Sequence, residues 1–98
     1  MNLEALWKLV REIPEGLCAS YGDLGRALPN PTSGRIVGRW MASAPEDIPW
    51  WRVIAKTGDL PIAKRDPVLG MTQRQLLEKE GVPFVDGRVD LPSCEWIP

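Results

Sequence analysis

The first twelve positions alternate apolar and polar residues at helical spacing, and the pattern stops at a proline. Four apolar side chains share one face of a helix with 3.6 residues per turn, namely Leu3, Leu6, Trp7 and Val10. Pro14 disfavours helical backbone in the residue that precedes it. The pattern therefore predicts a helix over residues 2–12, followed by a short extended piece over residues 17–19.

Two further helices are predicted between residues 20 and 43. Ser20 is a suitable N-cap for the first of them, which carries Leu24 and Leu28 and ends at the prolines that follow. Either Thr32 or Ser33 can cap the second, which extends to about residue 43. Its apolar stripe consists of Ile36, Val37, Trp40 and Met41.

The rest of the chain reads as short elements separated by Gly and Pro. Residues 48–54 are mostly apolar and predict a strand or extended segment, whereas residues 55–70 predict a loop or wing. Thr72 is the expected cap of a last long helix that ends at Gly81. Asp86-Gly87 predicts a tight hairpin, and Trp96 is expected to pack on the domain.

Length and composition bound the architecture. The chain has 98 residues, 44% hydrophobic and 26% charged, which predicts one domain over residues 1–98 and a monomer. No stretch approaches the length of a membrane span, so no membrane partner is expected. Two cysteines without any histidine provide neither a metal-ligand cluster nor a thiol–imidazole pair, so we expect no metal, no cofactor and a reduced intracellular protein.

The net charge of −1 argues against indiscriminate binding to polyanions, but the charges are unevenly distributed. Residues 31–75 carry seven Lys/Arg against four Asp/Glu, and residues 76–98 carry two against five. This distribution is consistent with a basic face opposite an acidic one, and equally with a mixed solvated surface.

Two short helices joined by a tight connection and followed by an extended wing are typical of a winged helix-turn-helix, whose second helix commonly contacts DNA. The predicted fold class is therefore mainly α with a small β wing. Small proteins also pair helices for packing alone, so the pattern by itself leaves both interpretations open.

Five motifs narrow the choice. In chain order they are Ile13-Pro14-Glu15-Gly16, Ser20-Tyr21-Gly22-Asp23-Leu24, Arg35-Ile36-Val37-Gly38, Ile48-Pro49-Trp50-Trp51-Arg52-Val53-Ile54 and Leu76-Leu77-Glu78-Lys79-Glu80-Gly81. Together they resemble the C-terminal domain of the O6-alkylguanine-DNA alkyltransferases. That family transfers an alkyl group from guanine O6 to a cysteine, and the resemblance implies its DNA-binding fold here.

The chain departs from this family at the reacting residues. Trp50 stands at the position of the acceptor cysteine and Trp51 at that of the histidine that relays the thiol proton, so the resemblance implies a protein that is not an enzyme. Glu80 matches the glutamate that supports this histidine, and we expect it to have nothing to orient. Cys18 and Cys94 lie outside the motif.

A non-catalytic subgroup, the alkyltransferase-like proteins, has tryptophan or alanine at the cysteine position. The loop Ala63-Lys64-Arg65-Asp66 and the ending Glu95-Trp96-Ile97-Pro98 also resemble this subgroup. The resemblance implies binding of O6-alkylguanine in double-stranded DNA by base flipping, and transfer of the lesion to nucleotide excision repair proteins. It places the chain with the nucleoid in a bacterial cytoplasm, or in a eukaryotic nucleus.

The resemblance also assigns roles to individual residues. Arg35 is expected to enter the base stack and fill the space left by the extruded nucleotide, and Tyr21 to help rotate that nucleotide outward. Gly38 permits close approach either to DNA or to another helix. The expected DNA-binding residues are Tyr21, Thr32, Ser33, Arg35, Gly38 and Arg39.

The lesion pocket is expected to have Trp50 as its floor, with the substituent on guanine O6 against the indole. Longer substituents would gain about 0.8 kcal/mol per buried methylene. Arg65 is expected to stack on the flipped base, and Arg52 either supports the pocket or forms a surface ion pair. The expected pocket residues are Tyr21, Trp50, Trp51, Arg52, Val53 and Arg65.

Two other functions stay open from the sequence. A winged-helix regulator that reads intact sequence would need several side chains directed at base edges in the major groove, and the third helix provides mainly Arg35 and Arg39. An active alkyltransferase that uses Cys18 or Cys94 would need a base, which a chain without histidine does not supply in the usual form.

Overall fold

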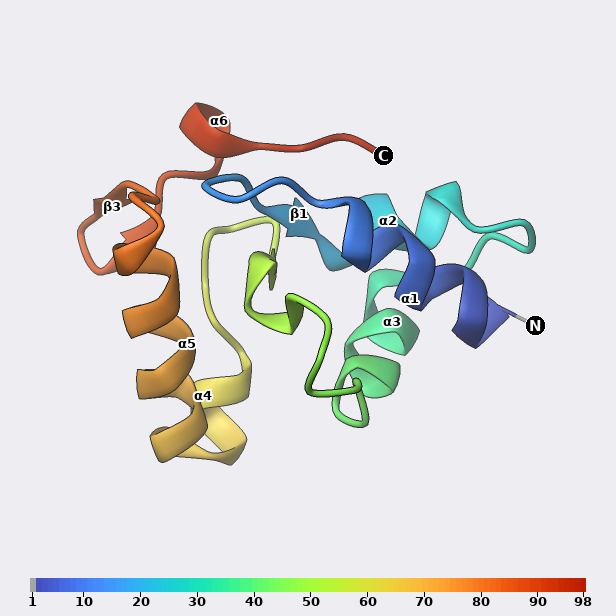
Figure 1. Cartoon of the computed structure of the whole chain (residues 1–98), viewed down its shortest axis with the longest axis horizontal. Coiled ribbons are helices and arrows are strands. Elements are labelled where there is room, and N and C mark those ends of the chain that lie inside the picture. Colours follow the sequence, from blue (N-terminus) through green and yellow to red (C-terminus); the bar gives the residue numbers. More distant parts are fainter. Residues whose placement is uncertain (1) are drawn as a thin grey trace.

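The computed structural model describes residues 2–98, which are mainly helical with two small sheets (Figure 1). The helices are α1 (Asn2–Glu12), α2 (Tyr21–Ala27), α3 (Gly34–Met41), α4 (Ile62–Arg65), α5 (Pro67–Lys79) and α6 (Leu91–Cys94). The strands are β1 (Ala19–Ser20), β2 (Val53–Ile54), β3 (Phe84–Val85) and β4 (Arg88–Val89), and a 3-10 turn, η1, covers Trp50–Arg52. Within residues 2–98, no helix is long and apolar enough to cross a membrane.

Helix α1 has the predicted bounds. Leu6 and Val10, one turn apart, are fully buried and turn the helix toward the core. The side-chain amide of Asn2 donates to the carbonyl of Asn30 at 2.8 Å. This bond ties the start of α1 to the connection between α2 and α3.

Serine hydroxyls begin α2 and α3, as the capping pattern predicts. Ser20 Oγ accepts from the Asp23 amide at 3.1 Å, and Ser33 Oγ accepts from the Ile36 amide at 3.3 Å. Of the two candidates for the second cap, Ser33 is therefore the one used. Gly25 lets the helices approach closely, because a Cβ on it would lie 2.3 Å from the Thr32 carbonyl oxygen.

The apolar stripe of α3 is narrower than predicted. Val37 and Met41, one turn apart, are buried, and Trp40 is half-buried. Ile36 is 38% exposed, so its assignment to the stripe was wrong. The reason is that Ile36 lies about 100° around the helix from Val37, beyond the face that packs on the core.

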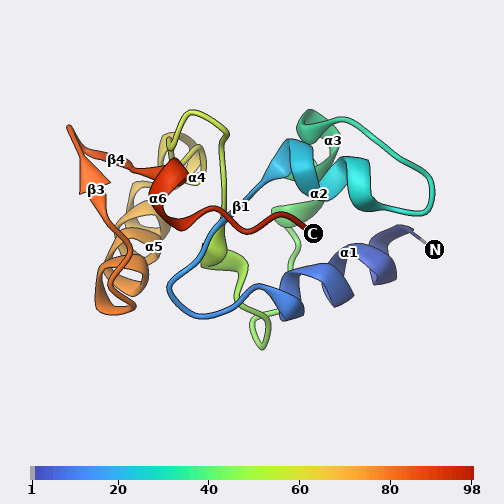
Figure 2. The same cartoon turned by 90° about the horizontal axis from the view of Figure 1, so that it is seen from above.

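The molecule has two halves, one built on the core around α1, α2 and α3 and the other on the core beneath α5. A parallel pair of strands joins these halves. Ala19 pairs with Val53, and Ser20 with Ile54. Successive residues of a strand point to opposite faces, so Val53 packs in the core around α1, α2 and α3, whereas Ile54 packs in the core beneath α5. The C-terminal segment crosses over β1 and holds it by two hydrogen bonds to Cys18 (Figure 2). Trp96 packs against the first core, as predicted.

The structure corrects the interpretation of residues 55–70. From Ile62 onward this segment forms α4 and the start of α5, and is not a loop or wing. Asp66 Oδ1 accepts from the Leu69 amide at 3.1 Å and Pro67 occupies the first turn, so this pair begins α5. The predicted Thr72 cap is wrong, since Thr72 lies inside α5 and its hydroxyl donates to the Val68 carbonyl.

The remaining elements agree in part with those predicted from the sequence. The segment predicted as extended over residues 48–54 is a strand only at its end, because η1 occupies residues 50–52. The hairpin of β3 and β4 is confirmed, and its two turn residues, Asp86 and Gly87, have φ of 52° and 80°, as a two-residue turn requires. Among the described residues, this antiparallel hairpin lies after α5.

Candidate functional site

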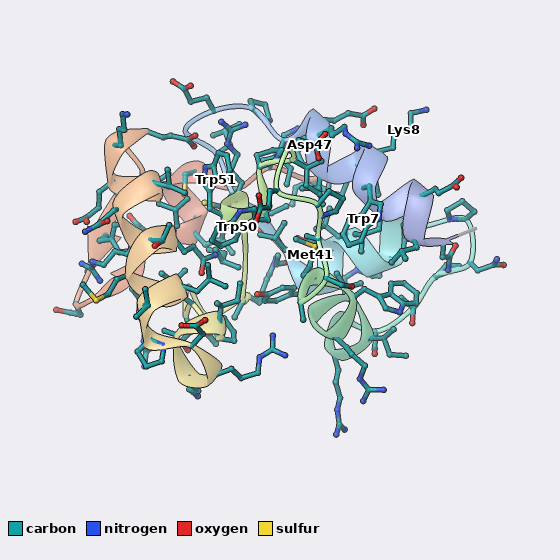
Figure 3. All side chains as sticks on the ribbon, turned by 60° about the horizontal axis from the view of Figure 1, so that its bottom comes forward. Trp7, Lys8, Met41, Asp47, Trp50 and Trp51 are labelled. Carbon is teal, nitrogen blue, oxygen red and sulfur yellow. The ribbon has the colours of Figure 1, made fainter. Side chains whose placement is uncertain are left out.

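A cavity of about 650 Å³ lies between the two halves of the molecule. One wall comes from the end of α3 and the segment after it, through Met41, Ala42, Ala44 and Glu46. The other comes from α4 and α5, through Ile62, Arg65, Asp66, Leu69, Thr72 and Leu76. Trp50 and Trp51 complete the lining, and Figure 3 shows them between α5 and Met41. Most of these side chains are apolar, so the cavity suits a flat ligand with an apolar substituent.

The two tryptophans are presented by η1. Their ring centroids are 6.0 Å apart and their planes make an angle of 86°, an edge-to-face arrangement favoured by aromatic quadrupoles. Gln73, fully buried on α5, donates its amide to the carbonyls of Trp51 and Val53, each at 3.2 Å. Helix α5 therefore holds the backbone of the turn that presents both rings.

Glu80 at the end of α5 contacts the turn from the side of Trp51. Its Oε2 accepts the indole N–H of Trp51 at 3.0 Å and a guanidinium N–H of Arg52 at 2.6 Å, and its Oε1 accepts Arg52 Nε at 2.9 Å. The expectation that Glu80 has nothing to orient is therefore wrong. Burial would raise the pKa of Glu80, but the hydrogen bonds from Arg52, Trp51 and the Gly16 amide outweigh it and hold the pKa below its ordinary value.

Arg52 lies behind the cavity wall. Its side chain is only 13% exposed, and besides the bidentate pair with Glu80 it donates to the Ile13 carbonyl at 2.8 Å. The guanidinium carbon also lies 5.5 Å from the centre of the Trp51 ring. The Arg52–Glu80 pair is therefore largely buried and not the surface ion pair that the sequence left open, and it joins η1 to the end of α5.

The other expected pocket residues divide into two groups. Trp50, Trp51 and Arg65 line the cavity together. Val53 is fully buried in the core, and Tyr21 lies at the start of α2 outside the lining. Burial raises the pKa of Tyr21 to about 12, although the positive charge of Arg65 acts to lower it.

The expected DNA-binding residues lie on α2, on α3 and in the connection between them. Arg35 and Arg39, one turn apart on α3, are exposed. A Cβ on Gly38 would lie 3.9 Å from the Tyr21 ring, an ordinary contact, so the fold does not require glycine there. Ser33 is exposed at the N-terminus of α3, and the Thr32 amide donates to the Gly25 carbonyl at 3.1 Å.

Much of the cavity wall was missed from the sequence. Leu69, Thr72 and Leu76 line it from α5, and Gln73 supports it from the same helix. These residues follow Asp66-Pro67, an N-cap followed by proline at the first helical position, which is a recognised sign of a helix start. That sign would have placed α5 correctly and, with it, this wall.

The structure thus combines a mainly apolar cavity with a neighbouring helix, α3, that carries two exposed arginines. The chain belongs to the family described as 6-O-methylguanine DNA methyltransferase, DNA binding domain, whose model matches residues 3–82.

Three characterised relatives show the range of this family. A DNA base-flipping protein of Escherichia coli (strain K12) is 33% identical over 96 residues, which cover 95% of this chain and 72% of the relative. Alkyltransferase-like protein 1 of Schizosaccharomyces pombe is 36% identical over 101 residues, which cover 95% of this chain and 92% of the relative. A methylated-DNA–protein-cysteine methyltransferase of Haemophilus influenzae is 33% identical over 85 residues, which cover 85% of this chain and 46% of the relative.

The fold also matches a solved complex. The crystal structure of S. pombe Atl1 in complex with damaged DNA containing O6-carboxymethylguanine superposes with a TM-score of 0.82 at 32% identity. The match covers 98% of this chain and 94% of that one.

Proposed function

We propose that this chain binds O6-alkylguanine in double-stranded DNA and holds the damaged nucleotide, flipped out of the helix, in the cavity above Trp50 and Trp51. The observation that carries the proposal is this mainly apolar cavity of about 650 Å³ next to α3. Similarity to Atl1 in complex with damaged DNA and to a protein named for DNA base flipping supports it. Extruding a base costs a few kcal/mol, which contacts in such a pocket offset.

The bound lesion is not repaired by this chain. Trp50 occupies the position of the acceptor cysteine, and an indole N–H is a donor without a nucleophilic lone pair. Cys18 and Cys94 are buried away from the cavity lining. Burial raises the pKa of Cys18 to about 12, with Cys94 adding to the effect, so its reactive thiolate form is scarce at neutral pH.

Helices α2 and α3 serve as a helix-turn-helix on the DNA, with the β3–β4 hairpin as a candidate for the wing. Arg35 fills the gap in the base stack, and Tyr21 and Gly38 lie beside the rotating nucleotide. Thr32, Ser33 and Arg39 contact phosphates, because the free amides at a helix N-terminus and a guanidinium both favour anions.

In the cavity, Trp50 faces the O6 substituent and Arg65 stacks on the flipped base. Arg52 and Val53 support this arrangement from behind the wall. The protein acts where the chromosome is, in a nucleoid or a nucleus, and presents the marked lesion to nucleotide excision repair proteins.

Binding to two otherwise identical duplexes, one with a single O6-methylguanine and one with guanine, tests the proposal. Fluorescence anisotropy at a fixed physiological salt concentration gives both affinities, and mass spectrometry of the protein afterwards detects alkyl transfer. We expect the lesion duplex to bind at least about tenfold more tightly, with no gain in protein mass. Equal affinities would contradict lesion recognition and favour a general DNA-binding regulator.

Arg35→Ala adds a residue-level test to the same assay. Since the arginine fills a space that exists only when a nucleotide is extruded, the variant should lose about tenfold in affinity for the lesion duplex. Arg11→Ala, which removes an exposed arginine from α1, is the matched control. An equal loss in both variants would show that only total charge matters.

A further inference from the structure

Trp51 is restrained on three sides although it lines a cavity. Its indole N–H donates to Glu80 Oε2 at 3.0 Å, and Arg52 lies over its ring at 5.5 Å. Its carbonyl accepts from the amide of Gln73 at 3.2 Å. The ring also makes an edge-to-face contact with Trp50 and packs against the core beneath α5.

We infer that Glu80 is a positioning residue for lesion recognition: it holds the plane of Trp51, and this plane sets which O6 substituents the cavity accepts. The inference rests on the proposed function and extends it from recognising the lesion to selecting among lesions. It gives the Glu80–Arg52 pair a role in binding although neither residue lines the cavity.

The orientation of a tryptophan ring is set by the two rotatable bonds of its side chain. Without a partner for its N–H, an indole at a cavity wall is free to adopt other staggered rotamers. A hydrogen bond to an ionised carboxylate is stronger than a neutral one, and it also fixes direction. Because Glu80 does not line the cavity, its hydrogen bond holds the Trp51 N–H at the wall and so keeps the ring out of the space above Trp50.

Release of Trp51 should therefore affect large substituents more than small ones. A ring that turns into the cavity takes up the volume that a benzyl group needs, whereas a methyl group still fits. The measured quantity is the ratio of affinities for duplexes with O6-benzylguanine and with O6-methylguanine. Loss of fold stability alone would weaken binding to both duplexes and leave this ratio unchanged.

A double-mutant cycle with Glu80→Gln and Trp51→Phe tests the inference. Glu80→Gln keeps the size of the side chain but removes its charge, and Trp51→Phe keeps an aromatic ring and leaves the Glu80–Arg52 pair in place. We expect each single change to lower the benzyl-to-methyl ratio by about fivefold, since pocket-fit differences are of this order. In the Trp51→Phe background, Glu80→Gln should change the ratio no further.

The control is Glu78→Gln, the same substitution two residues earlier on α5, where the side chain is 53% exposed. Its ratio should equal that of the wild type. A ratio unaffected by Glu80→Gln, or one lowered equally in both backgrounds, would overturn the inference and leave lesion binding intact. A wild type that binds neither lesion duplex more tightly than the guanine duplex would instead overturn the proposed function. If Glu80→Gln fails to fold, an unchanged ratio for Trp51→Phe alone overturns the inference.

Discussion

Trp51 can donate a hydrogen bond from its indole N–H but cannot relay a proton. An imidazole can donate one N–H and accept a proton at its second nitrogen, whereas an indole only donates. The Trp51 N–H still meets the carboxylate of Glu80, so a donor and an acceptor remain paired here. The pair can therefore hold the ring in place, but it cannot take a proton from a neighbouring nucleophile.

Introducing a cysteine at position 50 alone should therefore fail to produce alkyl transfer. Trp50→Cys places a thiol in the cavity, but no base is present to take its proton, so the thiolate stays scarce. We expect no mass gain after incubation with O6-methylguanine DNA. Trp50→Cys combined with Trp51→His supplies a base that Glu80 can orient, and should gain the mass of one methylene group, as followed by mass spectrometry.

The two variants act as controls for each other. Equal rates of methylation in the single and the double variant would show that a base is unnecessary in this cavity. Binding of both variants to the lesion duplex, measured by anisotropy, separates a failure of chemistry from a failure of recognition.

At the scale of elements, the contact between α2 and α3 depends on a glycine that no functional motif singles out. A Cβ on Gly25 would meet the Thr32 carbonyl oxygen at 2.3 Å, and backbone on both sides leaves little room to adjust. Gly25→Ala should destabilise the fold by about 1–3 kcal/mol, the usual cost of overpacking. Urea unfolding followed by tryptophan fluorescence measures this change.

Gly38→Ala is the matched control on the neighbouring helix. Its added methyl would lie 3.9 Å from the Tyr21 ring, and alanine favours helix by up to about 1 kcal/mol over glycine. We expect the free energy of unfolding to stay the same or to rise, whereas lesion affinity should fall if DNA approaches this glycine closely. A large loss of stability in Gly38→Ala would assign that glycine to packing.

The start of α5 provides a second test at this scale. Asp66 caps the helix through the Leu69 amide, so Asp66→Ala should cost about 1 kcal/mol of stability. Thr72→Ala removes the hydroxyl and methyl groups of an exposed side chain inside the helix, and should change stability by less than about 0.5 kcal/mol. Thermal unfolding of both variants decides which residue begins α5, and a larger effect of Thr72→Ala would contradict the structure.

The sequence predicted the elements that are determined by interactions between residues close together in the chain. Helical periodicity placed α1, a serine cap placed α2, and a turn dipeptide placed the β3–β4 hairpin. The motif resemblance brought Trp50, Trp51 and Arg65 to one site. No periodicity encodes the pairing of Glu80 with Trp51, which are 29 positions apart. The resemblance associated Glu80 with position 51, but the hydrogen bond to the indole was found only in the folded chain.

At the scale of the molecule, charged contacts connect segments that the two cores alone would leave loosely joined. The Arg52–Glu80 pair ties η1 to the end of α5. Lys56, after β2, contacts Asp23 on α2 at 3.2 Å and Glu95 in the C-terminal segment at 2.7 Å. Both sets of contacts depend on ionised carboxylates, so the relative placement of the cavity walls should respond to acid.

The pKa shifts set the pH window for this response. Burial raises the pKa of Asp23, but hydrogen bonds from Lys56 and Ser20 outweigh it, so the pKa of Asp23, like that of Glu80, lies below its ordinary value. A carboxyl whose pKa is lowered by folding stabilises the native state above its unfolded pKa, and this contribution is lost as the pH falls through the folded pKa. Stability should therefore decline below about pH 4.5, the ordinary value for Glu.

Stability at alkaline pH depends on groups whose pKa is raised by folding. Burial raises the pKa of Cys18 from 9.0 to about 12 and that of Tyr21 from 10.0 to about 12. Their neutral forms stabilise the fold below the unfolded pKa values, and this stability is lost as the pH rises from about 9. Because the chain has no histidine, the free energy of unfolding should vary by less than about 0.5 kcal/mol between about pH 4.5 and about pH 9.

Urea unfolding across this range, with wild type and Glu80→Gln side by side, tests the whole profile. Glu80→Gln removes one of the two carboxyl groups whose pKa is lowered by folding. The free energy of unfolding of this variant should be lower near neutral pH and should fall less steeply in acid. Glu78→Gln, on the exposed side of α5, should reproduce the wild-type curve. An acid limb that is identical in Glu80→Gln and wild type would show that the Glu80 network does not control the response, and would leave Asp23 and its contacts as its source.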